Sequence, residues 1–282
     1  MTEAAVAIAS PSSATPTRLV DLDVEGQRVR VGTRPGRGGV PLLLFNGIGA
    51  NLELLEPLLA ALDGIETIVF DVPGVGGSPA PRWPYRLRQL ARLATRVLAR
   101  LGHDGAVDVL GVSWGGALAQ QFAFQYPRRC RRLVLAATSA GSLMVPGRLS
   151  VIAGMANPRR YRDPAHLRDK GPALYGGALR TRPDLLQRHG RHVRVPHGRG
   201  YLYQLLATLG WTSLPWLPLL RQPTLVMAGT DDPIIPLVNA RLLARLIRRA
   251  RLHVVDDGHL FLVTGAAEHA ATIRAFLEEP MA

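Results

Sequence analysis

A serine stands where an apolar run gives way to a helix-like segment, in the sequence Asp108-Val-Leu-Gly-Val-Ser113-Trp-Gly-Gly-Ala-Leu-Ala119. The pattern around it is Gly-x-Ser-x-Gly. Because Gly111 and Gly115 lack Cβ atoms, strand and helix can pass close together while the serine is held exposed on a sharp, strained turn. This is the setting of a nucleophile. A serine hydroxyl also needs a base, an acid that orients the base, and donors for the developing oxyanion.

Two later apolar runs end in residues that can supply the base and the acid. The run 223–228 leads into Gly229-Thr-Asp-Asp232-Pro, and the run 251–255 leads into Asp256-Asp-Gly-His259. We predict that His259 takes the proton from Ser113 and returns it to the leaving group. We assign to Asp232 the task of fixing the imidazole tautomer and stabilising its cation.

The choice of acid stays open at the level of sequence. Asp231 is the main rival, because spacing alone does not separate it from Asp232. Asp256 and Asp257 are disfavoured because they lie so close to His259 in the chain, but the sequence leaves them open as well.

Backbone N–H groups are the expected donors of an oxyanion hole. One belongs to Trp114, directly after the nucleophile, and the other to Ile48, in the loop after the apolar run 41–45. Each such donor is typically worth about 3 kcal/mol of the barrier.

Strand-like and helix-like segments alternate around these residues, which predicts an α/β fold with a mainly parallel sheet covered on both faces. The stretch 18–33 has the alternation of a β-hairpin. Further strands are predicted at 41–45, 67–70, 106–112, 133–138, 223–228 and 251–255, and helices at 52–63, 86–102, 115–126, 237–249 and 262–278. All candidate site residues follow strands, at the edge where ligands of such sheets bind.

The regular alternation is interrupted between residues 140 and 220. We predict a disordered tail at 1–17, a core formed by 18–139 and 221–282, and an insertion at 140–220 after the sixth of about eight strands. Residues 142–220 hold 12 basic and 3 acidic residues, which is +9 of the net charge of +13. This concentration indicates a surface that faces something anionic.

Composition narrows the class of protein. All but one of the 34 basic residues are arginines; this usage is consistent with coding bias, so we expect no nucleic-acid partner. No apolar run reaches the ~18–20 residues that cross a bilayer. The single cysteine and an N-terminus without an early basic residue favour the cytoplasm.

Two other functions, dinucleotide binding and metal binding, have less support in the sequence. Gly47, Gly49 and Asp71 imitate a dinucleotide-binding fingerprint, but Leu52 occupies the third glycine position, so Asp71 is predicted to fix a glycine-rich loop. A histidine cluster in the insertion suggests a metal, yet the neighbouring arginines would repel a cation. We therefore expect neither a cofactor nor a metal. The clustered histidines are His189, His192 and His197.

With these residues in view, the chain resembles the α/β-hydrolases, and more narrowly the intracellular medium-chain-length poly(3-hydroxyalkanoate) depolymerases. The resemblance covers about 40–280. It rests on Leu43-Leu-Phe-Asn-Gly-Ile-Gly-Ala-Asn-Leu-Glu-Leu-Leu55, Phe70-Asp-Val-Pro-Gly-Val-Gly-Gly-Ser78, Leu110-Gly-Val-Ser-Trp-Gly-Gly-Ala-Leu-Ala-Gln-Gln-Phe122, Leu209-Gly-Trp-Thr-Ser213 and Asp256-Asp-Gly-His-Leu-Phe-Leu-Val-Thr264. Most α/β-hydrolases carry His-Gly where this chain has Asn46-Gly47, and the depolymerases share that departure.

The resemblance implies an α/β-hydrolase fold with an eight-stranded sheet and a helical lid at 140–220. It implies hydrolysis of a stored polyester to 3-hydroxy acids through an acyl-enzyme on Ser113, with Asn46, Gly47 and Trp114 at the substrate. Polyester granules and their coat proteins are the expected partners. A small ester, a lactone or a carbon–carbon bond is the alternative substrate, and a non-catalytic binding protein is disfavoured by the complete Ser-Asp-His set.

Overall fold

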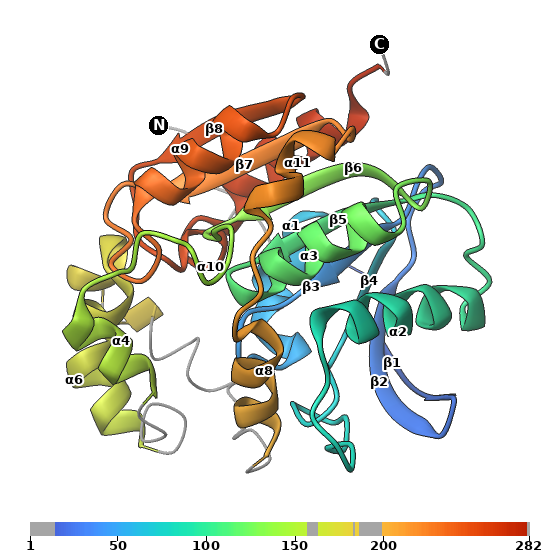
Figure 1. Ribbon diagram of the computed structural model, residues 1–282, viewed down its shortest axis with the longest axis horizontal. Coiled ribbons are helices and arrows are strands. Elements are labelled where there is room, and N and C mark those ends of the chain that lie inside the picture. The colour runs from blue at the N-terminus through green and yellow to red at the C-terminus, as the bar shows by residue number, and fades with distance from the viewer. Residues whose placement is uncertain (1–14, 157–162, 183, 186–198, 281–282) are drawn as a thin grey trace, which may run out of the picture.

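The structure is a computed structural model that describes residues 15–156, 163–182, 184–185 and 199–280. Its centre is one sheet of eight strands in the order β1-β2-β4-β3-β5-β6-β7-β8 (Figure 1). β1 and β2 form an antiparallel hairpin, β2 is antiparallel to β4, and every other pairing is parallel. The strands are β1 (Arg18–Val24), β2 (Gln27–Arg34), β3 (Leu42–Phe45), β4 (Thr67–Phe70), β5 (Val107–Val112), β6 (Cys130–Ala136), β7 (Thr224–Gly229) and β8 (Ala250–Val255).

Helices cover both faces of the sheet, as the apolar runs predict. Alternate residues of β3 point to opposite faces: Leu43 and Phe45 join the cluster that packs against α2 (Leu87–Arg100), α3 (Trp114–Gln125) and α9 (Leu237–Leu246). Leu42 and Leu44 join the cluster that contains α1 (Glu56–Ala61), α10 (Phe261–Thr264) and α11 (Ala266–Glu278). All four side chains are buried, and each buried leucine contributes about 2 kcal/mol.

Three predicted boundaries were wrong for identifiable reasons. The helix predicted at 52–63 is a 3-10 turn, Leu52–Leu55, followed by α1, whose first turn contains Pro57. The helix predicted at 262–278 breaks at Gly265 into α10 and α11. β6 begins at Cys130, three residues before the predicted start at 133. The charged residues at its beginning do not look like part of a buried strand, but Arg131 pairs with the buried Asp108 of β5 and so extends β6.

The segment between β6 and β7 contains helical pieces and no strand of the sheet among its described residues. It contains α4 (Leu149–Ala156), α6 (Pro164–Tyr175), a 3-10 turn Gly177–Arg180, α8 (Gly200–Thr208) and a 3-10 helix Leu214–Leu219. In Figure 1, α4 and α6 lie side by side, and α8 lies apart from them, toward α2. The predicted histidine cluster and residues 1–14 of the predicted tail lie outside the described residues, whereas Thr17 Oγ1 donates to Glu56 at 2.9 Å.

The order β4-β3-β5 places a topological switch point beside β3, because the chain leaves β3 in one direction and returns on its other side. Loops diverge at such a point and leave a crevice at the carboxyl ends of the strands. The loop after β3 and the turn after β5 therefore meet there. Within the described part of the chain, no helix is long and apolar enough to cross a membrane.

Candidate active site

Ser113 lies on a strained turn between β5 and α3. Its φ is 53° and its ψ is −118°, a conformation rare for a residue with a side chain. A Cβ at Gly115 would lie 2.2 Å from the Phe45 carbonyl oxygen, and one at Gly111 would lie 2.3 Å from the Gly115 carbonyl oxygen. Glycine at both positions therefore lets β3, β5 and α3 converge under the serine.

Asp232 and His259 follow β7 and β8 and contact each other. The distance from His259 Nδ1 to Asp232 Oδ2 is 2.7 Å, and both side chains are buried. The other carboxylate oxygen of Asp232 accepts the backbone N–H groups of Ile234 and Ile235, each at 2.9 Å. These bonds fix the carboxylate, and the carboxylate in turn orients the imidazole.

The neighbouring Asp231 points to different partners. Its carboxylate accepts the Arg180 guanidinium at 2.7 Å and the Gly177 backbone N–H at 2.7 Å. The hydrogen bond from Arg180 lowers the pKa of Asp231. Since Arg180 and Gly177 belong to the inserted segment, Asp231 ties that segment to the core, and only Asp232 of the two reaches His259.

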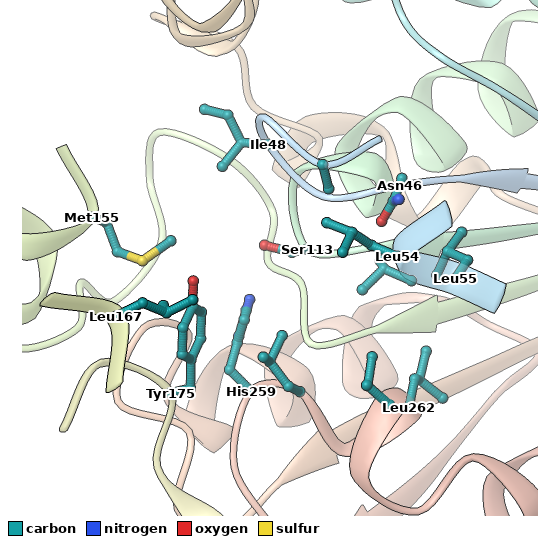
Figure 2. A pocket seen from close by; sticks show the side chains of 14 residues that line it. Asn46, Ile48, Leu54, Leu55, Ser113, Met155, Leu167, Tyr175, His259 and Leu262 are labelled. Carbon is teal, nitrogen blue, oxygen red and sulfur yellow. The ribbon is translucent and has the colours of Figure 1, made fainter. Parts of the chain in front are cut away.

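Ser113 and His259 face one pocket at the switch point. Figure 2 shows the imidazole nitrogen opposite Nδ1 pointing toward Ser113. Met155, Leu167 and Tyr175 of the inserted segment close the other side, and the His259 backbone N–H donates to the Tyr175 carbonyl oxygen at 2.7 Å. Most of the lining is apolar: Asn46, Ile48, Ala50, Leu54, Leu55, Val112, Ser113, Met155, Leu167, Tyr175, His259, Leu260, Leu262 and Val263.

The loop after β3 lies beside the serine. A Cβ on Gly47 would be 3.7 Å from Ser113 Cβ, and Ile48 lines the pocket. Asn46 also lines the pocket, but its amide is committed to the loop itself: it donates to the Asn51 carbonyl oxygen and accepts the Gly47 N–H, both at 2.8 Å.

The backbone and the side chain of Trp114 have separate roles, the first at the start of α3 and the second in a contact with α8. Its backbone begins α3, where helix N–H groups have no intrahelical acceptor. Its indole is buried, donates to the Gln204 carbonyl oxygen at 2.9 Å, and is not among the described side chains that line the pocket. The Trp114 side chain therefore joins α3 to α8.

A buried ionic network centred on Asp71 fixes the start of the 3-10 turn at Leu52 and the glycine-rich loop at Gly77. Asp71 accepts the backbone N–H groups of Leu52 and Gly77 at 2.8 and 2.7 Å, and the Arg30 guanidinium at 3.2 Å. Asp71 thus has the loop-fixing role expected of it. Arg30 also donates to Glu53 at 2.6 Å.

Glu53 gives this network a pH dependence. Burial raises its pKa, but hydrogen bonds from Arg30 and Asn51 outweigh burial and hold the pKa at about 2, below the usual 4.5. Its charge therefore stabilises the fold above about pH 4.5, and this contribution is lost as the pH falls toward 2. We expect Glu53→Gln to lower the free energy of unfolding at pH 7 by about 1 kcal/mol, since the partly exposed carboxylate keeps some hydration.

Urea unfolding of both proteins at pH 7 and near pH 2.5 measures this effect. The two stabilities should converge at the lower pH. The exposed Glu278, paired with Arg274 on the same helix, provides a control, and Glu278→Gln should show almost no difference at either pH. A gap for Glu53→Gln that is equal at the two values would contradict the assignment.

Sequence reasoning missed one residue that contacts the site loops. Gln204, on α8, is fully buried and accepts the Gly49 backbone N–H at 2.7 Å. No motif surrounds it.

Among the described residues, no three His, Cys, Asp or Glu side chains are grouped as a metal site.

An eight-stranded, mainly parallel sheet with Ser, Asp and His after separate strands is the arrangement of an α/β hydrolase. The chain belongs to that family: residues 40–266 match the family described as alpha/beta hydrolase fold. The narrower resemblance is also confirmed. The chain is 55% identical over 264 residues to a poly(3-hydroxyalkanoate) depolymerase of Ectopseudomonas oleovorans, which covers 93% of this chain and 92% of that protein.

More distant relatives share the fold. A 2-hydroxymuconate semialdehyde hydrolase of Pseudomonas sp. strain CF600 is 30% identical over 89% of this chain and 91% of its own. The solved structure of the enol-lactonase from Burkholderia xenovorans LB400 is 25% identical, with a TM-score of 0.78 over 92% of this chain and 100% of that one.

Proposed function

We propose that this chain hydrolyses the ester bonds of poly(3-hydroxyalkanoate) and releases 3-hydroxy acids, with Ser113 as the nucleophile. The observation that carries the chemistry is the buried pair of Asp232 and His259, 2.7 Å apart, in which His259 lines the same pocket as Ser113. The 55% identity to a poly(3-hydroxyalkanoate) depolymerase supports the substrate.

The reaction proceeds in two halves. Ser113 Oγ attacks the ester carbonyl carbon while His259 takes the hydroxyl proton, and Asp232 stabilises the resulting imidazolium. The backbone N–H groups of Ile48 and Trp114 bind the oxyanion. His259 then protonates the departing alcohol, which is the rest of the polymer, and leaves an acyl-enzyme. Water activated by His259 releases the acid and restores Ser113.

The apolar pocket suits the alkyl side group of a medium-chain monomer. Leu54, Leu55 and Leu262 line it from the core, and Met155 and Leu167 from the inserted segment. Burying an alkyl chain there gains about 0.8 kcal/mol per methylene group. In this proposal, segment 140–220 is therefore the lid, and 18–139 with 221–282 is the hydrolase core.

The basic charge of the lid extends the proposal to the granule. Its arginines meet carboxylate chain ends or an anionic granule coat, and the enzyme works in the cytoplasm at the granule surface. Part of this charge is already neutralised, because Arg168, Arg180 and Arg182 pair with Asp169, Asp231 and Asp184.

Granules of medium-chain and of short-chain polyester test the proposal. The protein should release 3-hydroxy acids from the medium-chain granules, as identified by mass spectrometry. Protein pretreated with a fluorophosphonate probe, and labelled at Ser113, should release none. Cleavage of short p-nitrophenyl esters without release from either granule would favour the small-ester alternative. Absence of labelling would favour a non-catalytic protein.

A further inference from the structure

Gln204, in the segment between β6 and β7, contacts the backbone of the loop after β3 and the indole side chain of Trp114. Gln204 Oε1 accepts the backbone N–H of Gly49, the neighbour of Ile48, at 2.7 Å. The carbonyl oxygen of Gln204 accepts the indole N–H of Trp114 at 2.9 Å. Gln204 is fully buried, so both bonds lie away from competing water.

The bond to Gly49 differs from the other bonds of this loop. Asn46 donates to Asn51 and accepts from Gly47, and the Ala50 N–H donates to the Gly47 carbonyl oxygen at 3.2 Å. These contacts close the loop on itself and set its shape. The Gln204 bond joins the loop to α8, 155 residues away in the chain, and so sets where the loop lies.

We propose that Gln204 is a positioning residue whose side chain holds the loop after β3, and with it the Ile48 N–H group, at the oxyanion. This inference rests on the proposed function. Gln204 is not among the described side chains that line the pocket, so it acts through the loop rather than on the substrate. A shift of about 1 Å in such donors costs as much as 100-fold in rate.

Only the oxygen of the Gln204 amide makes a bond in this arrangement. The Gly49 N–H requires an acceptor, which assigns Oε1 to the loop, and Nε2 has no partner among the described residues. A glutamate can therefore keep the bond, because burial favours its neutral carboxyl form. A methionine of similar length removes it.

Kinetics on p-nitrophenyl octanoate test this. Gln204→Met should lower kcat about 10- to 100-fold and leave KM within about twofold, because the lost interaction is made in the transition state. Affinity for a trifluoromethyl ketone, whose hemiketal oxyanion occupies the same position, should fall by a similar factor. Gln204→Glu should keep kcat within about threefold of the wild type.

Gln222 provides the matched control. It is also a buried glutamine with one unpartnered amide atom among the described residues, and its Nε2 donates to the Ala123 carbonyl oxygen at 3.1 Å. Gln222→Met should destabilise the fold to a similar extent but leave kcat within about twofold. An equal loss of kcat in this control would overturn the inference.

A folded Gln204→Met protein with wild-type kcat and inhibitor affinity would overturn it as well. If Gln204→Met does not fold, Gln204→Glu decides, since a kcat loss there above about tenfold contradicts an acceptor-only role. Labelling of wild-type Ser113 by a fluorophosphonate separates the two claims. Without labelling the proposed function fails, whereas labelling together with an inert Gln204→Met variant refutes only the role of Gln204.

Discussion

Ser113→Ala should lower kcat for p-nitrophenyl octanoate by about 10⁵-fold and abolish release of 3-hydroxy acids from medium-chain granules. The alanine has no side-chain oxygen, so it cannot form the acyl-enzyme. The residual rate comes from the oxyanion donors and from substrate binding, which act on a water molecule instead.

The fold should survive this change. Alanine lacks only the hydroxyl, and the positive φ of Ser113 is strained for either residue. Thermal unfolding of the variant checks that it folds, and Ser139→Ala is the control. Ser139 is a buried serine whose hydroxyl donates to the sulfur of Met144, so its loss should leave kcat within about twofold. Ester hydrolysis retained by Ser113→Ala would refute the proposed mechanism.

The sequence predicted the sheet and the places of its polar residues because both depend on local signals. The run that became β3 is apolar without interruption, as a strand buried on both faces must be, and β5 and β7 each contain a single polar residue, Asp108 and Thr224. Gly111 and Gly115 mark a close backbone approach that other residues prevent. Ser113 therefore stood out without knowledge of any distant contact.

What the sequence left open depends on contacts between remote residues. Asp231 and Asp232 are chemically identical, and their difference arises because Arg180 draws one carboxylate toward the inserted segment while His259 holds the other. Gln204 is a polar residue in a short helix, and the residues near it in the chain form no pattern that predicts its bond to Gly49. The early start of β6 has the same origin, in the pairing of Arg131 with Asp108.

Asp232→Asn should lower kcat by about 10⁴-fold, because the amide selects the wrong imidazole tautomer. The structure fixes how the new side chain would lie. Two backbone N–H groups, of Ile234 and Ile235, donate to Asp232 Oδ1, so the carbonyl oxygen of asparagine must take that position. Its NH₂ group then faces His259 Nδ1, where Asp232 Oδ2 now lies at 2.7 Å.

That orientation turns Nδ1 into an acceptor and places the imidazole proton on Nε2, the nitrogen that faces Ser113. His259 then has no lone pair for the serine proton, so acylation fails although every heavy atom keeps its place. Asp231→Asn is the matched control. It weakens the pair with Arg180 but leaves His259 untouched, so kcat should stay within about threefold. Ester hydrolysis kinetics of the two variants measure the difference, and a larger loss for Asp231→Asn would reassign the acid.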